Sequence, residues 1–527
     1  MAAWLLLLFC LSVFCVLGCV LLVAVLLGAL HVARLSTWKH LKNVPGPYEG
    51  IPLFWVVQQH LRAVRRKPLV PYNVSTLEIR VAHSVEYQSH GLYRFYVGHV
   101  PTVVVYQADL IEIVLTNTLS KSIDYSLLHS WLGTGLLTSS GSKWKTRRRM
   151  LTPAFHFRIL DDFVLPINDH TKRMVTRIRQ LSEQDDWIDV VPLAASTTLD
   201  VLLETIMGIT SSQQQPECQS YVKAANFLAD QMVFRAQTPW LLLDFIYYRT
   251  EYGHRYKAAT NLVHTFSTQV IQKRRKELIK ERSMAHAPLA DVAKPQKKRL
   301  RTFLDILLCY SLDNDDSFTD EDIREEVDTF MFEGHDTTAL AIAWALYMIA
   351  LHPEIQQKIQ QELDSVLGND LEKNISMNDM KEFKYLDCVT KECQRLYPSV
   401  PFIGRAVTKE LKLGDYLLPE GTTVDIFIYA LHRDPKIFPD PEVFDPERFS
   451  SENSASRHPF AFIPFSAGSR NCIGQKFANM EVKICLGNIL RNFNLRPLEH
   501  RDKLQLSSEL ILRAADGLKI KFTPRSL

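Results

Sequence analysis

A single cysteine near the C-terminus lies in a pattern suited to metal chemistry. Cys472 belongs to the segment 465–474 (FSAGSRNCIG), which also carries Arg470. The apolar, regularly spaced stretch 476–493 follows and predicts a helix. A Cys472 thiolate would therefore lie at a helix N-terminus, where unpaired N–H groups favour negative charge. This placement lowers the pKa of a cysteine and makes its sulfur a good metal ligand.

The surroundings of this cysteine indicate which metal it suits. Gly468 and Gly474 have no Cβ, so backbone N–H groups can approach the sulfur closely. A soft thiolate with such donors suits iron, and a lone cysteine without a CxxC partner disfavours zinc and iron–sulfur clusters. The alternative is a buried structural cysteine, the commoner fate of this residue type. The nine cysteines show no disulfide framework, which fits a reducing compartment.

Residues that could move protons lie within a long apolar helix predicted over 322–352. Glu333 and Thr337 share one face of this helix, and Asp336 lies beside them. Gly334 removes a side chain, at a cost of about 1 kcal/mol, and leaves room for something flat against the helix. An acid beside an alcohol in an apolar helix can relay a proton to a bound oxygen ligand. Structural pairing of these polar groups is an equally good explanation at this point.

Two sets of charged residues complete the pattern. Glu392 and Arg395 share a helical face, and a carboxylate with these two guanidiniums, Arg395 and Arg448, can form a bidentate network that locks architecture. Trp144 and Arg148, four residues apart, also share a helical face. An indole N–H and a guanidinium can together hold an anionic carboxylate.

The amino end carries an apolar stretch long enough to cross a bilayer. No charged residue occurs from 2 to 30, and a hydrocarbon core of about 30 Å needs roughly 20 apolar residues. Basic residues follow this stretch and none precedes it, so the positive-inside rule places the body of the protein in the cytosol. We expect three parts: a transmembrane signal anchor at 1–33, a basic and proline-rich hinge at 34–50, and one large catalytic domain at 51–527.

The composition is that of an ordinary globular protein. Of the 527 residues, 46% are hydrophobic and 23% charged, and a net charge of +3 does not call for nucleic acid. Thr319 and Asp322 form a capping-box pattern ahead of the long helix. The basic segment 272–301 is predicted as a helix end that runs into an exposed loop. The fold class is mainly α with a minor β-sheet region. Helical spacing is seen at 172–210, 261–279, 354–367 and 377–396, and strands are predicted in a hairpin at 91–106 and in short runs at 411–429.

Together and in this order, these motifs resemble those of a cytochrome P450, and the resemblance covers essentially the whole chain. It implies the fold of that family, haem b as cofactor, and Cys472 as the thiolate ligand of its iron. Asp336 and Thr337 match the acid–alcohol pair that delivers protons during oxygen activation. The groups that the resemblance assigns to cofactor binding, chiefly to the haem propionates, are Trp144, Arg148, Arg405, Phe465 and Arg470.

One segment narrows the resemblance to family 4, the fatty-acid omega-hydroxylases. It is 330–338 (FMFEGHDTT), in which Glu333 replaces the small residue that most members carry. In that family the glutamate can form an ester with a haem methyl group. The segments 131–144 and 459–477 are most similar to subfamily V. Residues that fall where related chains contact substrate, and that core packing explains equally well, are Leu127, Leu128, Val400, Phe402 and Ile403.

The resemblance also implies partners and a location. The chain has no GxGxxG-type dinucleotide fingerprint, so electrons are expected from NADPH through a separate reductase, with cytochrome b5 as a further partner. Arg147, Arg149 and Lys476 are candidates for the docking patch, and a solvated basic face explains them equally well. The expected location is the endoplasmic reticulum membrane, with a single span and a cytosolic catalytic domain.

Two alternatives to fatty-acid omega-hydroxylation remain open from the sequence. In the first, the same fold oxidises another lipophile, such as a steroid, a retinoid or a foreign compound. In the second, the protein binds haem as a sensor or as an isomerase that uses no dioxygen. Asp336 and Thr337 argue against the second alternative, because a protein that does not cleave dioxygen does not need to deliver protons.

Overall fold

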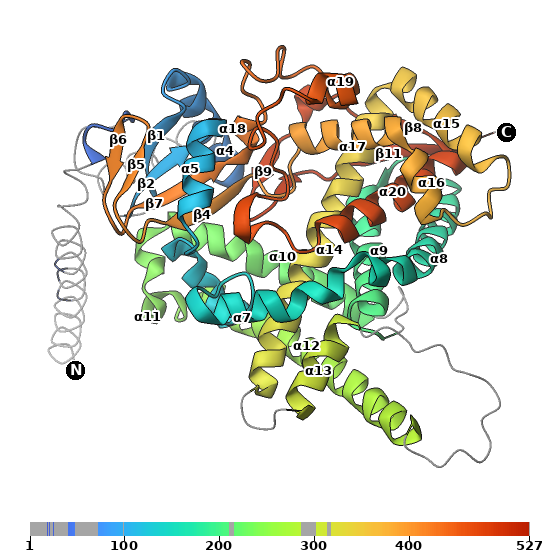
Figure 1. Ribbon diagram of the computed structural model, residues 1–527, viewed down its shortest axis with the longest axis horizontal. Helices are drawn as coiled ribbons and strands as arrows, with labels where there is room; N and C mark the ends of the chain where they lie inside the picture. Colours follow the sequence, from blue (N-terminus) through green and yellow to red (C-terminus); the bar gives the residue numbers. More distant parts are fainter. Residues whose placement is uncertain are drawn as a thin grey trace, which may run out of the picture.

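The computed structural model describes residues 41–47, 72–97, 100–209, 216–285, 302–313 and 318–525, with the isolated positions 18, 21 and 25 (Figure 1). The predicted anchor and much of the predicted hinge therefore lie outside the described residues. Among the residues that are described, no single helix has the length and apolar character to cross a bilayer. Two successive helices, Asp320–Leu351 and Pro353–Leu367, pass that test only as a pair bent by 113°.

The helix α14 (Asp320–Leu351) crosses the helical part of the molecule (Figure 1). The predicted capping box is confirmed, because the Thr319 side chain accepts from Asp322 N–H and the Asp322 carboxylate accepts from Thr319 N–H. Pro353 follows its end, as predicted. Most of α14 is buried, because it packs against α9 (Val190–Thr205), α12 (Glu251–Ala285) and α20 (Gln475–Asn492).

Two of the predicted helices are interrupted. The stretch 172–210 divides into α8 (Phe157–Ser182) and α9, because Asp189 caps α9 and the short strand β3 pairs with a C-terminal strand. The stretch 377–396 is broken at Phe383. The remaining α-helices of the described residues are α4 (Tyr72–Glu86), α5 (Ala108–Asn117), α6 (His129–Leu132), α7 (Gly141–Leu151), α10 (Pro216–Gln237), α11 (Asp244–Tyr247), α13 (Phe303–Asp313), α15 (Pro353–Leu367), α16 (Met377–Glu382), α17 (Lys384–Leu396), α18 (Ile428–Leu431) and α19 (Ser451–Ser454).

The largest sheet lies at one end of the molecule, apart from most of the helices (Figure 1). Its order is β1 (Leu92–Val97), β2 (Val100–Val105), β7 (Thr423–Phe427), β4 (Phe402–Ala406). The β1–β2 pair is the predicted hairpin, β2 and β7 run parallel, and β7 and β4 run antiparallel. The smaller sheets are formed by β3 (Ile188–Asp189), β11 (Lys519–Pro524) and β8 (Phe493–Pro497), by β9 (Leu506–Ser508) and β10 (Leu512–Ala514), and by β5 (Leu411–Leu413) and β6 (Tyr416–Leu418).

The described part of the predicted hinge is docked on the sheet. Leu41 and Val44 are buried in the hydrophobic core beneath it. The backbone N–H of Arg94 donates to Pro45 O at 2.6 Å, and the Arg94 guanidinium donates to Leu41 O at 2.9 Å. The mainly helical fold with a minor sheet agrees with the predicted fold class.

Candidate active site

The described residues enclose a cavity of about 1710 Å³, its open mouth included, between α14, α9 and the segment 465–474. Predicted site residues that line it are Leu128, Trp144, Arg148, Glu333, Thr337, Val400, Phe402, Ile403, Phe465, Arg470 and Cys472. Those that do not are Leu127, Asp336, Glu392, Arg395, Arg405 and Arg448.

The cysteine loop holds Cys472 at the edge of this cavity. Cys472 N–H donates to Phe465 O at 2.9 Å, which closes the loop just before α20 begins. Gly468 has a φ of +71°, and a Cβ there would lie 3.0 Å from Leu115 O, so the loop requires glycine. Among the described cysteines Cys472 alone is exposed, which makes it the one available to a ligand in the cavity.

The pKa of Cys472 differs from the sequence-based prediction. The protein atoms around the cavity desolvate the thiol, although its surface stays open to a ligand there, and this desolvation raises its pKa to about 11. The charge of Glu333 adds to the rise. The backbone N–H groups of Gly474 and Gln475, with Arg148, act in the predicted direction but do not outweigh burial. The helix N-terminus therefore does not ionise this thiol by itself. A metal ion bound to the sulfur does ionise it, because a coordinated thiol is deprotonated outright.

Arginines form a positive cluster beside the cavity, in which Arg405 is 1% exposed and Arg148 and Arg470 are half-buried. Arg405 Nη1 donates to Gly404 O at 3.0 Å, and Arg470 donates to Leu137 O at 3.4 Å and to Ser139 O. The Nε atoms of Arg405 and Arg470 have no hydrogen-bond partner among the described residues. The Arg470 guanidinium lies 4.4 Å from the centre of the Trp144 ring. Arg148 donates to the backbone and side-chain oxygens of Asn471 at 2.9 and 2.8 Å. Burial, with repulsion from Arg405 and Arg148, lowers the pKa of Arg470 to about 10, so the cluster favours an anionic group.

One further cation at the cavity carried no recognisable signal in the sequence. Lys121 lines the cavity in the loop after α5, and its ammonium lies 4.4 Å from the centre of the Tyr125 ring. Burial and repulsion from Arg405 and Arg470 lower its pKa. Lys121 follows no helical or strand period, so only the three-dimensional fold reveals it.

The predicted face of α14 does reach the cavity. Glu333 and Thr337 both line it, and Thr337 Oγ1 donates to Glu333 O at 2.6 Å. Burial raises the pKa of the Glu333 carboxyl, while Lys121 lowers it. Gly334 also lines the cavity, which agrees with the predicted room beside the helix. A Cβ on Gly334 would lie 2.1 Å from Leu202 Cδ1 of α9, so the Leu202 side chain would have to move.

Asp336 does not lie in the cavity beside Thr337. Its carboxylate accepts a hydrogen bond from Arg513 Nη2 of β10 at 2.5 Å, and the residue is 1% exposed. The predicted acid and alcohol are therefore adjacent in sequence but have different surroundings. The proton-delivery role of Asp336 stays a prediction, and it requires this carboxylate to leave Arg513.

The Glu392–Arg395 pair forms the bidentate network that the sequence predicted. Arg395 Nε and Nη2 donate to the two Glu392 oxygens at 2.7 and 2.8 Å, and both residues are 0% exposed. Arg448 Nε lies 3.6 Å from Glu392 Oε1. The network lies outside the cavity, which suits its predicted architectural role.

Arg147 is unsuited to the predicted docking patch. It is buried, and its guanidinium is paired with Asp322 and Glu326 of α14 at 2.5 and 3.1 Å. Arg149 and Lys476 are exposed and remain candidates for that patch. Four-residue helical spacing placed Arg148 toward the cavity but could not show that Arg147 had a partner on another helix.

The apolar wall of the cavity extends beyond the predicted residues. Leu128, Val400, Phe402 and Ile403 line it, whereas Leu127 packs against the hydrophobic core. Apolar residues that line it and that the sequence analysis missed include Leu202, Ile206, Phe330, Phe332, Leu510 and Ile511. They come from α9, α14 and the β9–β10 turn, and no local spacing links them.

The residues of this site fit an iron porphyrin. The described residues contain no group of three or more His, Cys, Asp or Glu side chains that could hold a metal ion. An iron bound by Cys472 must therefore bring its other ligands with it, as haem does. The unpartnered Nε atoms of Arg405 and Arg470 suit the carboxylates of such a group. Cavity, lone cysteine and arginines together define the class of haem-thiolate proteins.

Comparison with known proteins identifies the family. The family model described as "Cytochrome P450" matches residues 71–522. The chain belongs to the cytochrome P450 family, and within it to family 4. Cytochrome P450 4V2 of Mus musculus is 40% identical over 512 residues, 96% of this chain and 94% of the relative. Human cytochrome P450 4V2 is 42% identical (85% of each chain), and cytochrome P450 4c3 of Drosophila melanogaster is 42% identical (82% of each).

Proposed function

We propose that this P450 monooxygenase hydroxylates fatty acids at or near the omega carbon. The observation that carries the proposal is Glu333, which lies in the segment that resembles the omega-hydroxylases and lines the same cavity as Cys472. Bound haem supplies the oxygen-activating chemistry, and a thiolate ligand favours cleavage of the O–O bond. Electrons reach it from NADPH through a separate reductase, with cytochrome b5 as a further partner.

The side chains of the cavity have separate tasks in this proposal. Cys472 holds the iron, while Arg148, Arg405 and Arg470, with Trp144, hold the propionates. The wall that includes Phe330, Phe332 and Ile511 excludes water and admits an alkyl chain. Thr337 offers a hydroxyl that can pass a proton within the cavity.

Glu333 adds a covalent tether in this proposal. Glu333 would hold the haem through an ester to a haem methyl group. Forming that ester would remove one proton and two electrons from the methyl group, and the dioxygen consumed in turnover would accept the two electrons. A tethered haem makes the pocket stiff and narrow, which favours attack at a chain terminus over the weaker internal C–H bonds.

A product analysis tests the substrate class. Purified protein, reductase and NADPH are supplied with a chain-length series of saturated fatty acids, and with steroids and retinoids as controls. We expect omega and near-omega hydroxy acids that depend on both NADPH and dioxygen. The absence of an omega product from every acid, or faster turnover of a steroid or retinoid, would overturn the proposal.

Haem extraction tests the tether separately. After turnover, acidified organic solvent should release all haem from Glu333→Ala but leave part of it on the wild-type chain. Glu325→Ala is a control on the same helix, at a residue that does not line the cavity. Complete release from the wild type would exclude the ester while leaving the substrate class intact.

The membrane location is also part of the proposal. The uncharged stretch 2–30 and the basic residues after it support an anchor in the endoplasmic reticulum with the catalytic domain in the cytosol. Removal of residues 1–33 should then release the protein from the membrane fraction at high pH. An unchanged membrane fraction would contradict a single N-terminal anchor.

A further inference from the structure

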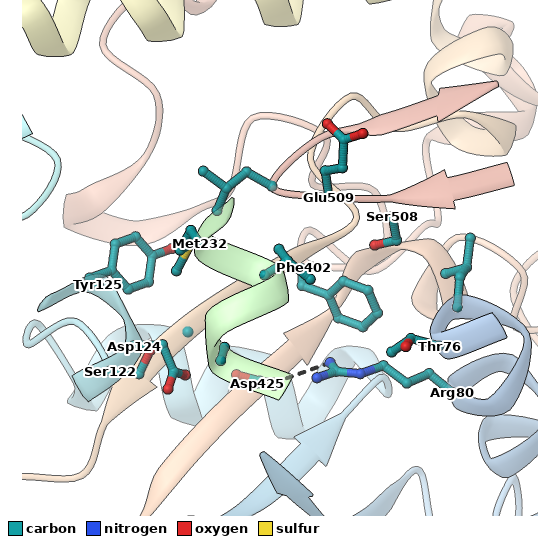
Figure 2. Close-up of a pocket in the computed structure, with 15 residues that line it drawn as sticks. Thr76, Arg80, Ser122, Asp124, Tyr125, Met232, Phe402, Asp425, Ser508 and Glu509 are labelled. Atoms are coloured by element: carbon teal, nitrogen blue, oxygen red, sulfur yellow. Dashed lines mark hydrogen bonds and ion pairs between the residues drawn. The ribbon is translucent and has the colours of Figure 1, made fainter. Parts of the chain in front are cut away.

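A second pocket, of about 730 Å³ with its open mouth included, adjoins the first. The two share Tyr125, Phe402 and Leu510 as lining residues, of which Figure 2 labels Tyr125 and Phe402. Glu509, in the turn between β9 and β10, lines the second pocket and belongs to none of the motifs that the sequence analysis singled out. Figure 2 shows its carboxyl group pointing away from the other labelled residues of this pocket, and the side chain is 16% exposed.

Glu509 and Asp336 share one guanidinium. Arg513 Nε donates to Glu509 Oε2 at 3.1 Å, and Arg513 Nη2 donates to Asp336 Oδ2 at 2.5 Å. Arg513 Nη2 also donates to Asn226 Oδ1 of α10 at 2.9 Å. All three charged side chains are largely buried, with exposed fractions of 16%, 14% and 2% for Glu509, Arg513 and Asp336. A continuous set of contacts therefore joins the second pocket to the middle of α14.

We propose that Glu509 is a positioning residue, which acts through Arg513 to control whether Asp336 stays on β10 or turns to serve the haem cavity. The proposal rests on the proposed function, because it gives Asp336 the task of proton delivery. Glu509 itself touches neither substrate nor haem. Its part is to compete with Asp336 for the same cation.

The charges of this cluster make the protonation state of Glu509 the one that controls the Arg513–Asp336 contact. Two carboxylates face one guanidinium, and Asp230 of α10 adds a further negative charge nearby. Burial, Asp230 and Asp336 raise the pKa of Glu509 to about 7, against the opposing effect of Arg513. The other titratable groups around the cluster are buried or paired: the pKa of His335 is lowered by burial, the pKa of Tyr221 is raised by burial, and Arg80 is paired with Asp425 at 3.2 Å (Figure 2).

The direction of the effect follows from hydrogen-bond strength. When Glu509 takes a proton from solvent in the second pocket, its bond to Arg513 loses one charge and weakens. Arg513 is then left to Asp336 alone and holds it firmly. When Glu509 releases that proton to the same solvent, the two carboxylates compete, and Asp336 leaves Arg513 more easily.

The experiment compares the pH dependence of coupling in Glu509→Gln and wild type. The holoenzyme is assayed with reductase and NADPH between about pH 6 and pH 8.5, and product and hydrogen peroxide are each divided by NADPH consumed. In the wild type, product per NADPH should rise through about pH 7. In Glu509→Gln, whose side chain stays neutral, it should remain at the low-pH value, severalfold below wild type at high pH.

Two further variants control for folding and for the turn itself. Glu509→Asp retains a titratable group and should keep a rise with pH at a shifted midpoint. Ser508→Ala, at a neighbouring residue that lines the same pocket, should leave the wild-type profile unchanged. A wild-type rise in Glu509→Gln, or a flat profile in Glu509→Asp, would overturn the proposal.

The experiments distinguish a wrong substrate class from a wrong role for Glu509. If no fatty acid is hydroxylated, the substrate class is wrong, and the pH profile is measured with whichever lipophile yields product. If none does, peroxide formed per NADPH still reports proton delivery, and it should follow pH in the wild type but not in Glu509→Gln. Equal peroxide profiles in the two proteins would overturn the inference alone.

Discussion

Two regions of the molecule contain arginines that are shielded from solvent, and these arginines differ in their hydrogen-bond partners. Arg395 is fully buried, and its three nitrogens donate to Glu392 and to the carbonyl oxygens of His432, Pro441 and Val443. Arg405 is almost as buried, yet its one hydrogen bond among the described residues runs from Nη1 to Gly404 O at 3.0 Å, and no carboxylate pairs with it. The Arg395 guanidinium holds parts of the protein together. The Arg405 guanidinium has donors left over for a ligand.

The energetics support this distinction. A buried charge without a partner destabilises a protein by several kcal/mol, so such charges are retained where a ligand compensates them. In the first region the compensation comes from Glu392 and backbone carbonyls. In the second, around Arg405 and Arg470, it comes from the propionates of bound haem in our proposal.

The largest effect on stability is expected from removal of Glu392, the acid that pairs with Arg395. Glu392→Ala leaves Arg395 buried without its carboxylate, which should lower the free energy of unfolding by roughly 3–5 kcal/mol. Denaturant unfolding of the holoprotein measures this loss. Glu447→Ala, at an exposed residue of the adjoining segment, should change it by less than about 0.5 kcal/mol. A loss below about 1 kcal/mol for Glu392→Ala would mean that the pair is not structural.

Removal of an arginine beside the cavity should affect cofactor retention. In our proposal, Arg405→Ala and Arg470→Ala each delete donors to a propionate, and hydrogen bonds to charged groups contribute about 1.5–3 kcal/mol. On a Glu333→Ala background, in which no ester can hold the haem, haem transfer to apomyoglobin should therefore become roughly tenfold faster or more. Arg149→Ala, an exposed arginine of α7, is the control on the same background and should retain haem as Glu333→Ala alone does. Unchanged transfer rates in both cavity variants would show that these cations do not hold haem.

A third region, between α7 and α14, differs from both because acids outnumber cations there. Asp322, Glu325 and Glu326 pair with Lys143 and Arg147. Burial raises the pKa of Glu326 to about 7 although it is paired with Arg147. The folded state keeps this proton to a higher pH than the unfolded chain does, so the free energy of unfolding should fall as pH rises from about 4.5 to 7.

The expected size of this effect between pH 5 and pH 8 is about 2–3 kcal/mol, because a shift of one pKa unit corresponds to about 1.4 kcal/mol. Unfolding of the holoprotein at about pH 5 and pH 8 measures it. Glu326→Gln, which cannot ionise, should show a smaller decrease between the two pH values. An equal decrease in the variant would assign the pH dependence to other carboxyls.

Local sequence patterns predicted the features that depend on neighbours along the chain. The capping box of Thr319, the β1–β2 hairpin and the Glu392–Arg395 pair all arise within a few residues of one another, and the structure forms each of them. Glu333 and Thr337 both line the cavity, as predicted, because they lie one helical turn apart on the same face of α14.

Features that depend on a partner far along the chain were missed or misread. Asp336 is held by Arg513, and Gly334 lies close to Leu202 of α9, and no local period shows either contact. Lys121 reaches the cavity from a loop without a motif. The pKa of Cys472 was predicted in the wrong direction because burial, a tertiary effect, outweighs the helix N-terminus.

The most direct test of the haem-thiolate site is the spectrum of the reduced carbon-monoxide complex. The wild-type protein should give the strongly red-shifted band of a thiolate-ligated haem. Cys472→Ser should lose that band, whereas Cys485→Ser, at a buried cysteine of α20 outside the cavity, should keep it. Retention of the red-shifted band in Cys472→Ser would contradict the assignment of this cysteine as the iron ligand.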